Sequence, residues 1–301
     1  MKSSKPDQPT LAEHILESHS PRALNSYLRT IEQYTHYLGE AVARKATYPQ
    51  VVDYLGVLRE RPMHPKTIRN HLYAIKMYYQ WLVDTGQRRD HPCRDLFLKD
   101  KINRAIPVET LYSKAELDEL LDTHRASLPL TRGRDKIILS LLVCQAVTVF
   151  EIIHLKITDV DLKKAKLRLA GSPKTMRRVL PLKPEQIMLF NDYLQRIRPL
   201  LWKNNHRPRE QDYDTLILSV RGRQMNPNSI SSMFKAPLSH GEKISPQKIR
   251  QSVIAHLLKS GQDLRVIQAF TGHKRVSSVE EYRQTGLEEL KAAIDKYHPL
   301  G

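Results

Sequence analysis

The 301-residue sequence has little cysteine: Cys93 and Cys144 are the only two. Two cysteines so far apart supply neither a disulfide framework nor a cluster of Cys and His ligands with the spacing of a metal site. The sequence therefore predicts no metal, and a reducing, cytoplasmic compartment is the simplest interpretation. Cys144 lies in an apolar run, which predicts a core position for it.

Long hydrophobic runs are absent as well. The longest covers residues 137–147, well short of the ~20 residues that a membrane-spanning helix needs. The N-terminal residues MKSSKPDQPT carry charge but no apolar stretch, so they do not read as a signal peptide. These absences predict a soluble cytoplasmic protein without a membrane partner.

Acidic residues are outnumbered, with 32 Asp and Glu against 49 Lys and Arg, a formal net charge of +17. Such an excess favours a polyanion as partner, because neutralised phosphates release their counterions. A basic protein that is merely soluble remains the alternative, since charge alone does not exclude it. With 27% charged and 40% hydrophobic residues, the composition is globular, and the length allows two domains.

The first predicted domain is a helical bundle over residues 21–100, after a flexible N-terminus over residues 1–20. Apolar residues recur at three- and four-residue steps in three segments, which predict helices near 21–38, 49–59 and 64–82. At the start of the third helix, polar and cationic side chains are candidates for contacts with DNA, and the alternative for each is a solvated surface position: Lys66, Arg69 and Asn70.

A linker over 101–112 leads to a second predicted domain over 113–286. Its first helix begins at a capping box formed by Ser113 and Glu116. Further helices are expected over 134–148, 151–155 and 184–203, with two strands over 164–171 and 177–182 and a short strand over 215–220. The expected fold class is mainly α with a small β-hairpin or sheet (α+β).

Three features near the C-terminus stand in an order that suits phosphodiester chemistry. Arg250 lies near the start of one predicted helix, Gly272-His273 follows a second, and Tyr282 comes nine positions after the histidine. A cation, a hydrogen-bond donor and a nucleophile can surround one phosphate. Each residue alone also has an ordinary interpretation: a surface ion pair for the arginine, a cap for the histidine and a packed side chain for the tyrosine.

In these motifs and their spacing, the second domain resembles the catalytic domain of tyrosine recombinases, the phage integrase and Xer group. The stretch HLLKSGQDLRVIQAFTGH, the hairpin PKTMRRVLPL with Lys174 and the segment VTVFEIIHLKITDVDL all match the family pattern. The first domain resembles the family's helical core-binding domain. The resemblance implies a site-specific recombinase or integrase in which Tyr282 forms a 3′-phosphotyrosyl link to double-stranded DNA.

The family also implies roles for other residues. Arg250 would clamp the phosphate, His273 would donate a hydrogen bond to it, Lys174 would protonate the leaving 5′-oxygen, and Glu151 would orient the site. No cofactor is implied, since the phosphotyrosyl bond conserves the energy of the cleaved linkage. The family works as a tetramer on DNA, and residues 287–301 resemble the helix that docks into a neighbouring subunit, with an intramolecular cap as the alternative. A second recombinase or an accessory protein is a further conceivable partner.

The sequence departs from the family pattern at two positions. Thr148 stands where the family has its first catalytic arginine, and Gln247 stands where it has the histidine of His-x-x-Arg. A threonine hydroxyl is a neutral donor, and glutamine cannot shuttle a proton. Reduced activity is the expectation, unless another cation reaches the phosphate. The candidate substitutes are Arg177 and Arg178 on the hairpin, which are also predicted DNA contacts, and Arg132 and Arg134 before the apolar helix.

Two other functions stay open at this point. A DNA-binding relative that has lost catalysis would act as a regulator or structural partner at recombination sites. A topoisomerase-like nicking and closing enzyme would share the covalent chemistry without synapsis. Retention of Tyr282, His273, Arg250 and Lys174 favours an active recombinase.

Overall fold

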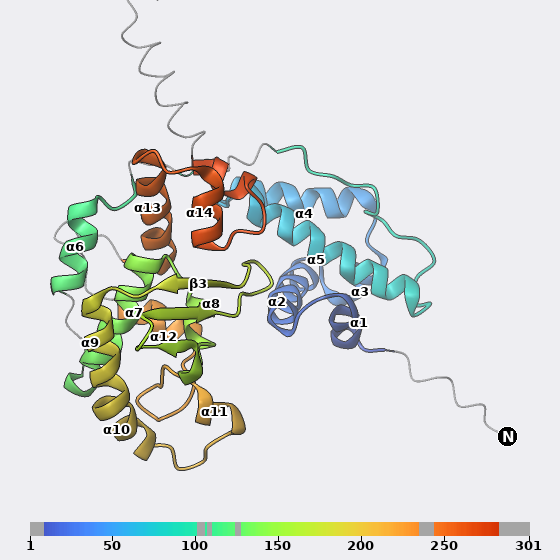
Figure 1. Cartoon of the computed structure of the whole chain (residues 1–301). Helices are drawn as coiled ribbons and strands as arrows, with labels where there is room; N and C mark the ends of the chain where they lie inside the picture. The colour runs from blue at the N-terminus through green and yellow to red at the C-terminus, as the bar shows by residue number, and fades with distance from the viewer. Residues whose placement is uncertain (1–8, 101–105, 107–109, 124–127, 235–243, 283–301) are drawn as a thin grey trace, which may run out of the picture. The chain divides into compact units, whose positions relative to one another are not determined.

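The computed structural model describes residues 9–100, 106, 110–123, 128–234 and 244–282. The chain divides into two compact units, residues 1–103 and 104–301 (Figure 1). Each unit has a separate hydrophobic core. Most of the predicted linker and all of the predicted C-terminal helix over 287–301 lie outside the described residues. Within these residues, no helix combines the length and apolar character needed to cross a bilayer.

The N-terminal unit is entirely helical over residues 9–100, as the sequence pattern predicts. Its core is built around buried tyrosines. The hydroxyls of Tyr34 and Tyr79 lie 2.6 Å apart, and Tyr79 donates to the carbonyl oxygen of Ala43 at 2.8 Å, which satisfies both buried groups. The helices are α1 (Leu11–Ser18), α2 (Pro21–Leu38), α3 (Glu40–Lys45), α4 (Tyr48–Glu60) and α5 (Pro65–Asp84).

The prediction of a flexible segment over residues 1–20 is wrong for α1. Thr10 and Glu13 form a capping box, in which the Thr10 hydroxyl accepts from the Glu13 amide and the Glu13 carboxylate accepts from the Thr10 amide at 2.8 Å. Ile15 is completely buried against the bundle. A polar composition hid this helix because only one of its side chains is fully buried.

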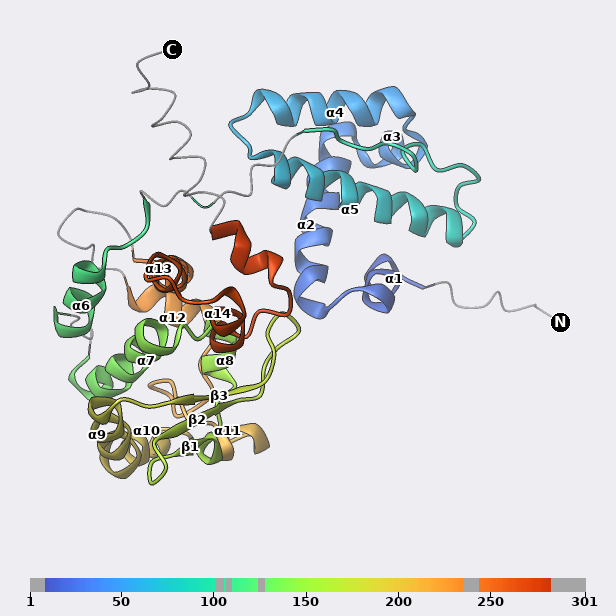
Figure 2. The same ribbon diagram turned by 45° about the horizontal axis from the view of Figure 1, so that its top comes forward.

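The second unit surrounds a helix that is apolar on nearly every side. This helix, α7 (Arg132–Gln145), packs against three others (Figure 2). The predicted capping box at Ser113 is confirmed, with its hydroxyl accepting from the Glu116 amide at 3.2 Å. The other helices are α6 (Lys114–Thr123), α8 (Val149–Ile153), α9 (Pro184–Asp192), α10 (Arg198–Lys203), α11 (Glu210–Asp214), α12 (Pro227–Met233), α13 (Pro246–Lys259) and α14 (Leu264–Thr271).

A three-stranded antiparallel sheet lies beside these helices, in the order β1 (Val160–Asp161), β2 (Lys166–Leu169) and β3 (Arg178–Pro181). The register pairs Leu167 with Leu180 and Leu169 with Arg178. Since side chains alternate along a strand, Arg178 shares the inward face of β3 with the buried Leu180. The strand predicted over 215–220 is not formed; Thr215 and Leu218 make only isolated bridges.

Candidate active site

Arg250 is held inside the second unit by the C-terminal ends of two helices. Its Nη1 donates to the carbonyl oxygen of Ala146, just after α7, and its Nη2 donates at 2.7 Å to Thr271, at the end of α14. Both helix ends carry partial negative charge that favours a guanidinium. Burial lowers the pKa of Arg250 to about 10, so the group stays charged at neutral pH. Three of its five N–H groups have no acceptor among the described residues, which leaves a fork for an oxyanion.

Glu151, in α8, is the centre of a buried network. Thr148 precedes α8, and its amide and hydroxyl each donate at 2.9 Å to Oε2 of Glu151. The hydroxyl of Thr175 donates to Oε1 at 2.8 Å. Burial raises the pKa of the Glu151 carboxyl, but the bonds from Arg178 and the other donors outweigh it and hold the pKa below its ordinary value.

Arg178 makes the tightest ion pair of this network. Its Nη1 and Nη2 donate to the two oxygens of Glu151 at 2.5 and 3.2 Å, and its Nε donates to the carbonyl oxygen of Phe270 at 2.8 Å. The side chains are only 6% and 1% exposed. Arg178 therefore ties β3 to the start of α8 and to the end of α14.

The hairpin loop that carries Lys174 is bonded to the Gly272-His273 turn. The amide of Met176 donates to the Gly272 carbonyl oxygen at 2.7 Å, and Thr175 forms a single antiparallel bridge with His273. Segments almost a hundred residues apart in sequence are thus joined at one place. This pairing brings two predicted site elements together.

His273 is a neutral imidazole in this environment. Burial, together with the charges of Arg250 and Arg178, lowers its pKa to about 4. The Thr271 hydroxyl lies 2.7 Å from Nδ1 and fixes the ring, while Nε2 has no partner among the described residues. With its ring proton on Nε2, His273 can donate one hydrogen bond to a phosphate oxygen.

Tyr282 lies in the helical segment 277–282 and packs on a small apolar cluster that includes Ile254, Ile267 and Val279. Burial raises the pKa of its phenol to about 12, although the charge of Arg250 acts in the opposite direction. Arg250 donates to the carbonyl oxygen of Thr271, and the Thr271 hydroxyl bonds the ring of His273. Tyr282 packs on side chains of α13 and α14, the helices that carry Arg250 and Thr271.

The remaining predicted site residues differ in their placement. Thr148 is in the network, where it caps α8 and bonds Glu151. Lys174, Arg177 and Gln247 are exposed, with the lysine at the hairpin turn and the glutamine in the first turn of α13. Lys174 has no ion pair within the part of the chain that the structure describes. Its position beside the turn at His273 suits a side chain that reaches a bound substrate.

In the N-terminal unit, the predicted DNA contacts lie at the start of α5. Lys66, Arg69 and Asn70 are exposed, and Lys66 and Asn70 stand four positions apart on one helix face. Arg69 also donates to the carbonyl oxygens of Leu98 and Asp100, at 3.5 and 3.3 Å. Their contact with DNA stays a prediction.

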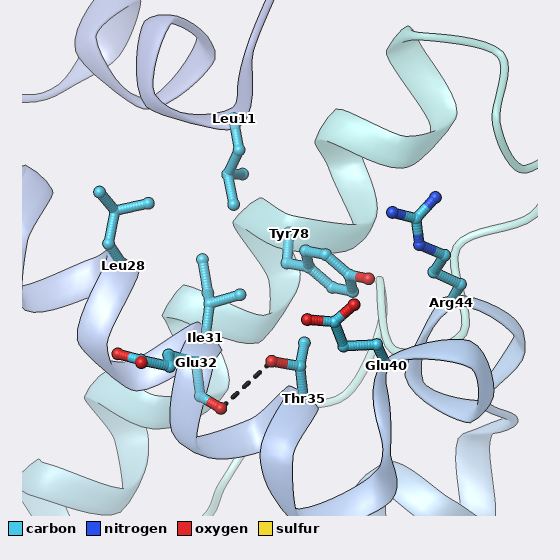
Figure 3. Close-up of a pocket in the computed structure, with 8 residues that line it drawn as sticks. All are labelled: Leu11, Leu28, Ile31, Glu32, Thr35, Glu40, Arg44 and Tyr78. Atoms are coloured by element: carbon cyan, nitrogen blue, oxygen red, sulfur yellow. Dashed lines mark hydrogen bonds between the residues drawn. The ribbon is translucent and has the colours of Figure 1, made fainter.

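A cavity of about 380 Å³ lies elsewhere, in the N-terminal unit. Figure 3 shows its apolar wall beside two carboxylates, an arginine and the hydroxyl of Thr35, which donates to the Glu32 carbonyl oxygen at 3.1 Å. None of the candidate catalytic residues lines it. The lining residues are Leu11, Leu28, Ile31, Glu32, Thr35, Glu40, Arg44 and Tyr78.

The network contains residues whose roles the sequence did not reveal. Thr175 was passed over, and Arg178 was predicted only as a DNA contact or a substitute cation, although it is buried and paired. The signal for Arg178 was the alternation along and just after β3, in which Leu180 and Leu182 are buried and Arg178 falls on the same face. Among the described residues, no group of three or more His, Cys, Asp or Glu could hold a metal ion.

Gly272 is the glycine on which this geometry depends most directly, and it yields a prediction. Its φ is +74°, and a Cβ there would lie 2.4 Å from Nη1 of Arg178. Gly272→Ala is expected to destabilise the protein by roughly 1–3 kcal/mol through backbone strain. It should also displace the Arg178 guanidinium, which lowers the rate of DNA cleavage.

Gly261 provides a matched control in the same unit. Its φ is +79°, but a Cβ there meets nothing within 4 Å. Gly261→Ala should therefore show the backbone strain alone, without the loss of cleavage. Urea denaturation and a cleavage assay on both variants check the prediction, and equal cleavage by the two would contradict a role for the contact with Arg178.

Comparison with known families agrees with this architecture. The phage integrase family matches residues 111–288, and the phage integrase N-terminal SAM-like domain matches residues 13–86. The first match alone covers more than half of the chain, so the chain belongs to the phage integrase family, the tyrosine recombinases. The resemblance inferred from the sequence motifs is confirmed.

Individual relatives lie in the Xer group. The chain is 26% identical to the tyrosine recombinase XerC of Alcanivorax borkumensis over 286 residues, which cover 93% of this chain and 89% of that protein. It is 30% identical to the tyrosine recombinase XerD of Yersinia pestis over 232 residues, or 76% and 74% of the two chains.

Among solved structures, the chain is similar to the XerH site-specific recombinase bound to palindromic difH substrate in a post-cleavage complex. The TM-score is 0.70 at 17% identity, with 90% of this chain and 79% of that chain covered. At this identity the likeness bears on the fold alone. It confirms the predicted class, mainly helical with a small antiparallel sheet.

Proposed function

We propose that this protein is a site-specific DNA recombinase that cleaves and rejoins double-stranded DNA through a covalent link to Tyr282. The observation that supports the proposal is a chain of contacts, in which Arg250 bonds Thr271, Thr271 bonds His273, and Tyr282 packs on the helices that carry the first two, next to the hairpin that bears Lys174. Membership of the tyrosine recombinase family supports strand cleavage and rejoining in general.

In the proposed reaction, the Tyr282 oxygen attacks phosphorus and a P–O bond to tyrosine forms as the bond to the 5′-oxygen breaks. The phenol gives its proton to solvent water, and the leaving oxygen takes one from Lys174. Arg250 offers its unoccupied N–H groups to the non-bridging oxygens, and His273 offers Nε2. Charge that develops on the phosphate then meets donors that are already in place, which is the largest single source of catalysis in many enzymes.

Slower cleavage than in family members with the full set of residues is part of the proposal. Thr148 is committed to capping α8 and to Glu151, so it does not supply a charge to the phosphate. Loss of one preorganised donor costs roughly 3–4 kcal/mol of transition-state stabilisation. Gln247 can still donate a hydrogen bond from the start of α13 but does not transfer a proton.

We also propose that the protein binds and assembles on DNA. Double-stranded DNA is the partner that the net charge of +17 favours. Family membership supports the proposal of a synaptic tetramer in which residues 287–301 dock into a neighbouring subunit. The comparisons do not favour the alternative of a DNA-binding relative without catalysis.

Covalent capture tests the proposal. The purified protein is incubated with fragmented genomic DNA of its source, and DNA that stays attached after denaturation with detergent is recovered and sequenced. A duplex that carries the recovered site, nicked next to the cleavage position, then traps the intermediate because the short leaving strand diffuses away. A protein–DNA adduct is the expected result, and binding of this duplex without any adduct would refute catalysis.

Tyr282→Phe is expected to abolish the adduct, since phenylalanine lacks the attacking oxygen. Binding to the same duplex in a gel-shift assay should persist, because the aromatic ring keeps its place in the apolar cluster around Ile254. Tyr213→Phe is the control, at an exposed tyrosine of the same unit, and it should form adduct at the rate of the unaltered protein. An adduct that survives in Tyr282→Phe would contradict the assignment of the nucleophile.

A further inference from the structure

The network around Glu151 contains a buried arginine side chain that comes from β3, next to the hairpin loop with Lys174. Of the four arginines considered as substitutes for the residue missing at Thr148, Arg132 and Arg177 are exposed. Arg134 is buried, but it is bonded to Asp135 and to the carbonyl oxygen of Leu218. Arg178 alone among the four reaches the network around Glu151.

The Arg178 guanidinium lies next to the Thr148 side chain. Both groups donate to the same oxygen of Glu151, Arg178 from Nη2 at 3.2 Å and Thr148 from its hydroxyl at 2.9 Å. Two donors on one carboxylate oxygen are close neighbours. Arg178, from β3, therefore brings positive charge to the same carboxylate that the side chain at position 148 contacts.

Arg178 also faces the residues that are proposed to hold the phosphate. The space above Gly272, directly before His273, is filled by Nη1 of Arg178. The charge of Arg178 contributes to the lowered pKa values of His273 and Arg250, which places it within electrostatic range of both. In a buried site with little water, such a charge acts strongly.

Most N–H groups of Arg178 already have an acceptor. Nε and Nη1 are occupied by the carbonyl oxygens of Phe270 and Met176 and by Glu151, and one N–H of Nη2 is bonded to Glu151. The second N–H of Nη2 has no acceptor among the described residues. One N–H and a charge shared with a carboxylate amount to less than a dedicated arginine, in line with the slower cleavage proposed above.

We propose that Arg178 supplies the second guanidinium of the phosphate pocket, from β3, in place of the arginine that is absent at Thr148. This inference rests on the proposed function and deepens it. Glu151 holds the guanidinium in position, and the remaining N–H of Nη2 donates to a non-bridging oxygen of the scissile phosphate. Lys174 and Arg178 then act from the same hairpin.

The nicked duplex described above tests the proposal with Arg178→Ala and with Arg265→Ala, at an exposed arginine of the same unit, as the control. Arg178→Ala should lower the rate of adduct formation by on the order of a hundredfold or more, as expected for one preorganised donor. Arg265→Ala should keep that rate at saturating protein. Equal rates for the two variants, with the unaltered protein active, overturn the proposal. An inactive unaltered protein instead overturns the proposed function.

Two further measurements separate charge from a merely structural role. Thr148→Arg in the Arg178→Ala background returns a guanidinium to the same carboxylate and should recover at least about tenfold of the rate, as one restored charged donor predicts. A duplex with a neutral methylphosphonate at the scissile position needs less countercharge, so it should narrow the gap between Arg178→Ala and the unaltered protein. If neither change recovers any rate, Arg178 only ties the hairpin in place.

The double variant Arg178→Met/Glu151→Gln tests the proposal in case Arg178→Ala does not fold. It removes both buried charges together, which avoids leaving Glu151 without its partner. The same loss of rate is expected from this folded variant, and an unchanged rate would overturn the proposal even if Arg178→Ala does not fold.

Discussion

Arg250→Ala is expected to slow formation of the covalent adduct by on the order of a thousandfold, with a much smaller effect on DNA binding. The reason is the position of the guanidinium between the ends of α7 and α14, where two carbonyl oxygens fix its orientation. Charge that develops on the phosphate then meets donors that need no rearrangement. DNA binding depends chiefly on the many exposed cations of the chain, so it survives the loss of one buried arginine.

Arg250→Lys should be nearly as damaging as the alanine variant. A lysine ammonium has three donors on a flexible stem, and it cannot bridge Ala146, Thr271 and two phosphate oxygens as a planar fork does. Arg250→Ala leaves the carbonyl oxygens of Ala146 and Thr271 without this donor, at a cost of roughly 1–3 kcal/mol for each buried group. The rate is therefore measured at a temperature at which each variant is folded.

Arg265→Ala is the control for this series, because Arg265 is an exposed arginine of the same unit. At saturating protein it should leave the rate of adduct formation unchanged. A rate for Arg250→Ala within tenfold of this control would contradict the assignment of Arg250 to the phosphate, since such a difference is only about 1.4 kcal/mol.

The site elements that are close in sequence were the ones that could be predicted. Arg250, Gly272-His273 and Tyr282 lie within 33 residues of one another, so their spacing along two helices and a turn already limits where they can meet. The capping box at Ser113 and the apolar helix over 132–145 were predictable for the same reason, because caps and helical periodicity are local properties.

The contacts of Glu151 could not be predicted in this way. Its partners come from Thr148, Thr175 and Arg178, and only the first is a neighbour in sequence. Strand alternation indicates that Arg178 faces inward, but it does not predict that the Glu151 carboxylate lies next to it. The choice among four arginines therefore required the tertiary structure.

The prediction of secondary structure from the sequence failed at two places for related reasons. The helix α1 carries only one fully buried residue, Ile15, so its apolar signal was weak. The run over 215–220 is largely apolar and buried over 215–218, yet it forms only single bridges. A short apolar run can be buried without pairing into a sheet. Hydrophobic periodicity does not distinguish such a segment from a buried strand.

Glu151→Gln is expected to lower the free energy of unfolding of the second unit by about 3–5 kcal/mol. The amide keeps the shape of the side chain, but it leaves the Arg178 guanidinium buried at 6% exposure without a counter-charge. The amide nitrogen would also face a donor from Thr148, Thr175 or Arg178. Urea denaturation in a Trp81→Phe background measures the effect, because the remaining tryptophan, Trp202, then reports on this unit alone.

The difference in the free energy of unfolding between the unaltered protein and Glu151→Gln should depend on pH. This dependence shows whether the charge of Glu151 causes the difference. The pKa of Glu151 is lower in the folded protein than its ordinary value of 4.5, so its contribution is fully present above that value and is lost as the pH falls through the folded pKa. The difference between the unaltered protein and Glu151→Gln should therefore be constant near neutral pH and shrink below about pH 4.5. Asp192→Asn, which breaks an exposed pair with Arg196, should cost only about 0–1 kcal/mol. A difference for Glu151→Gln that does not change with pH would mean that packing, and not the charge of the carboxylate, holds Arg178 in place.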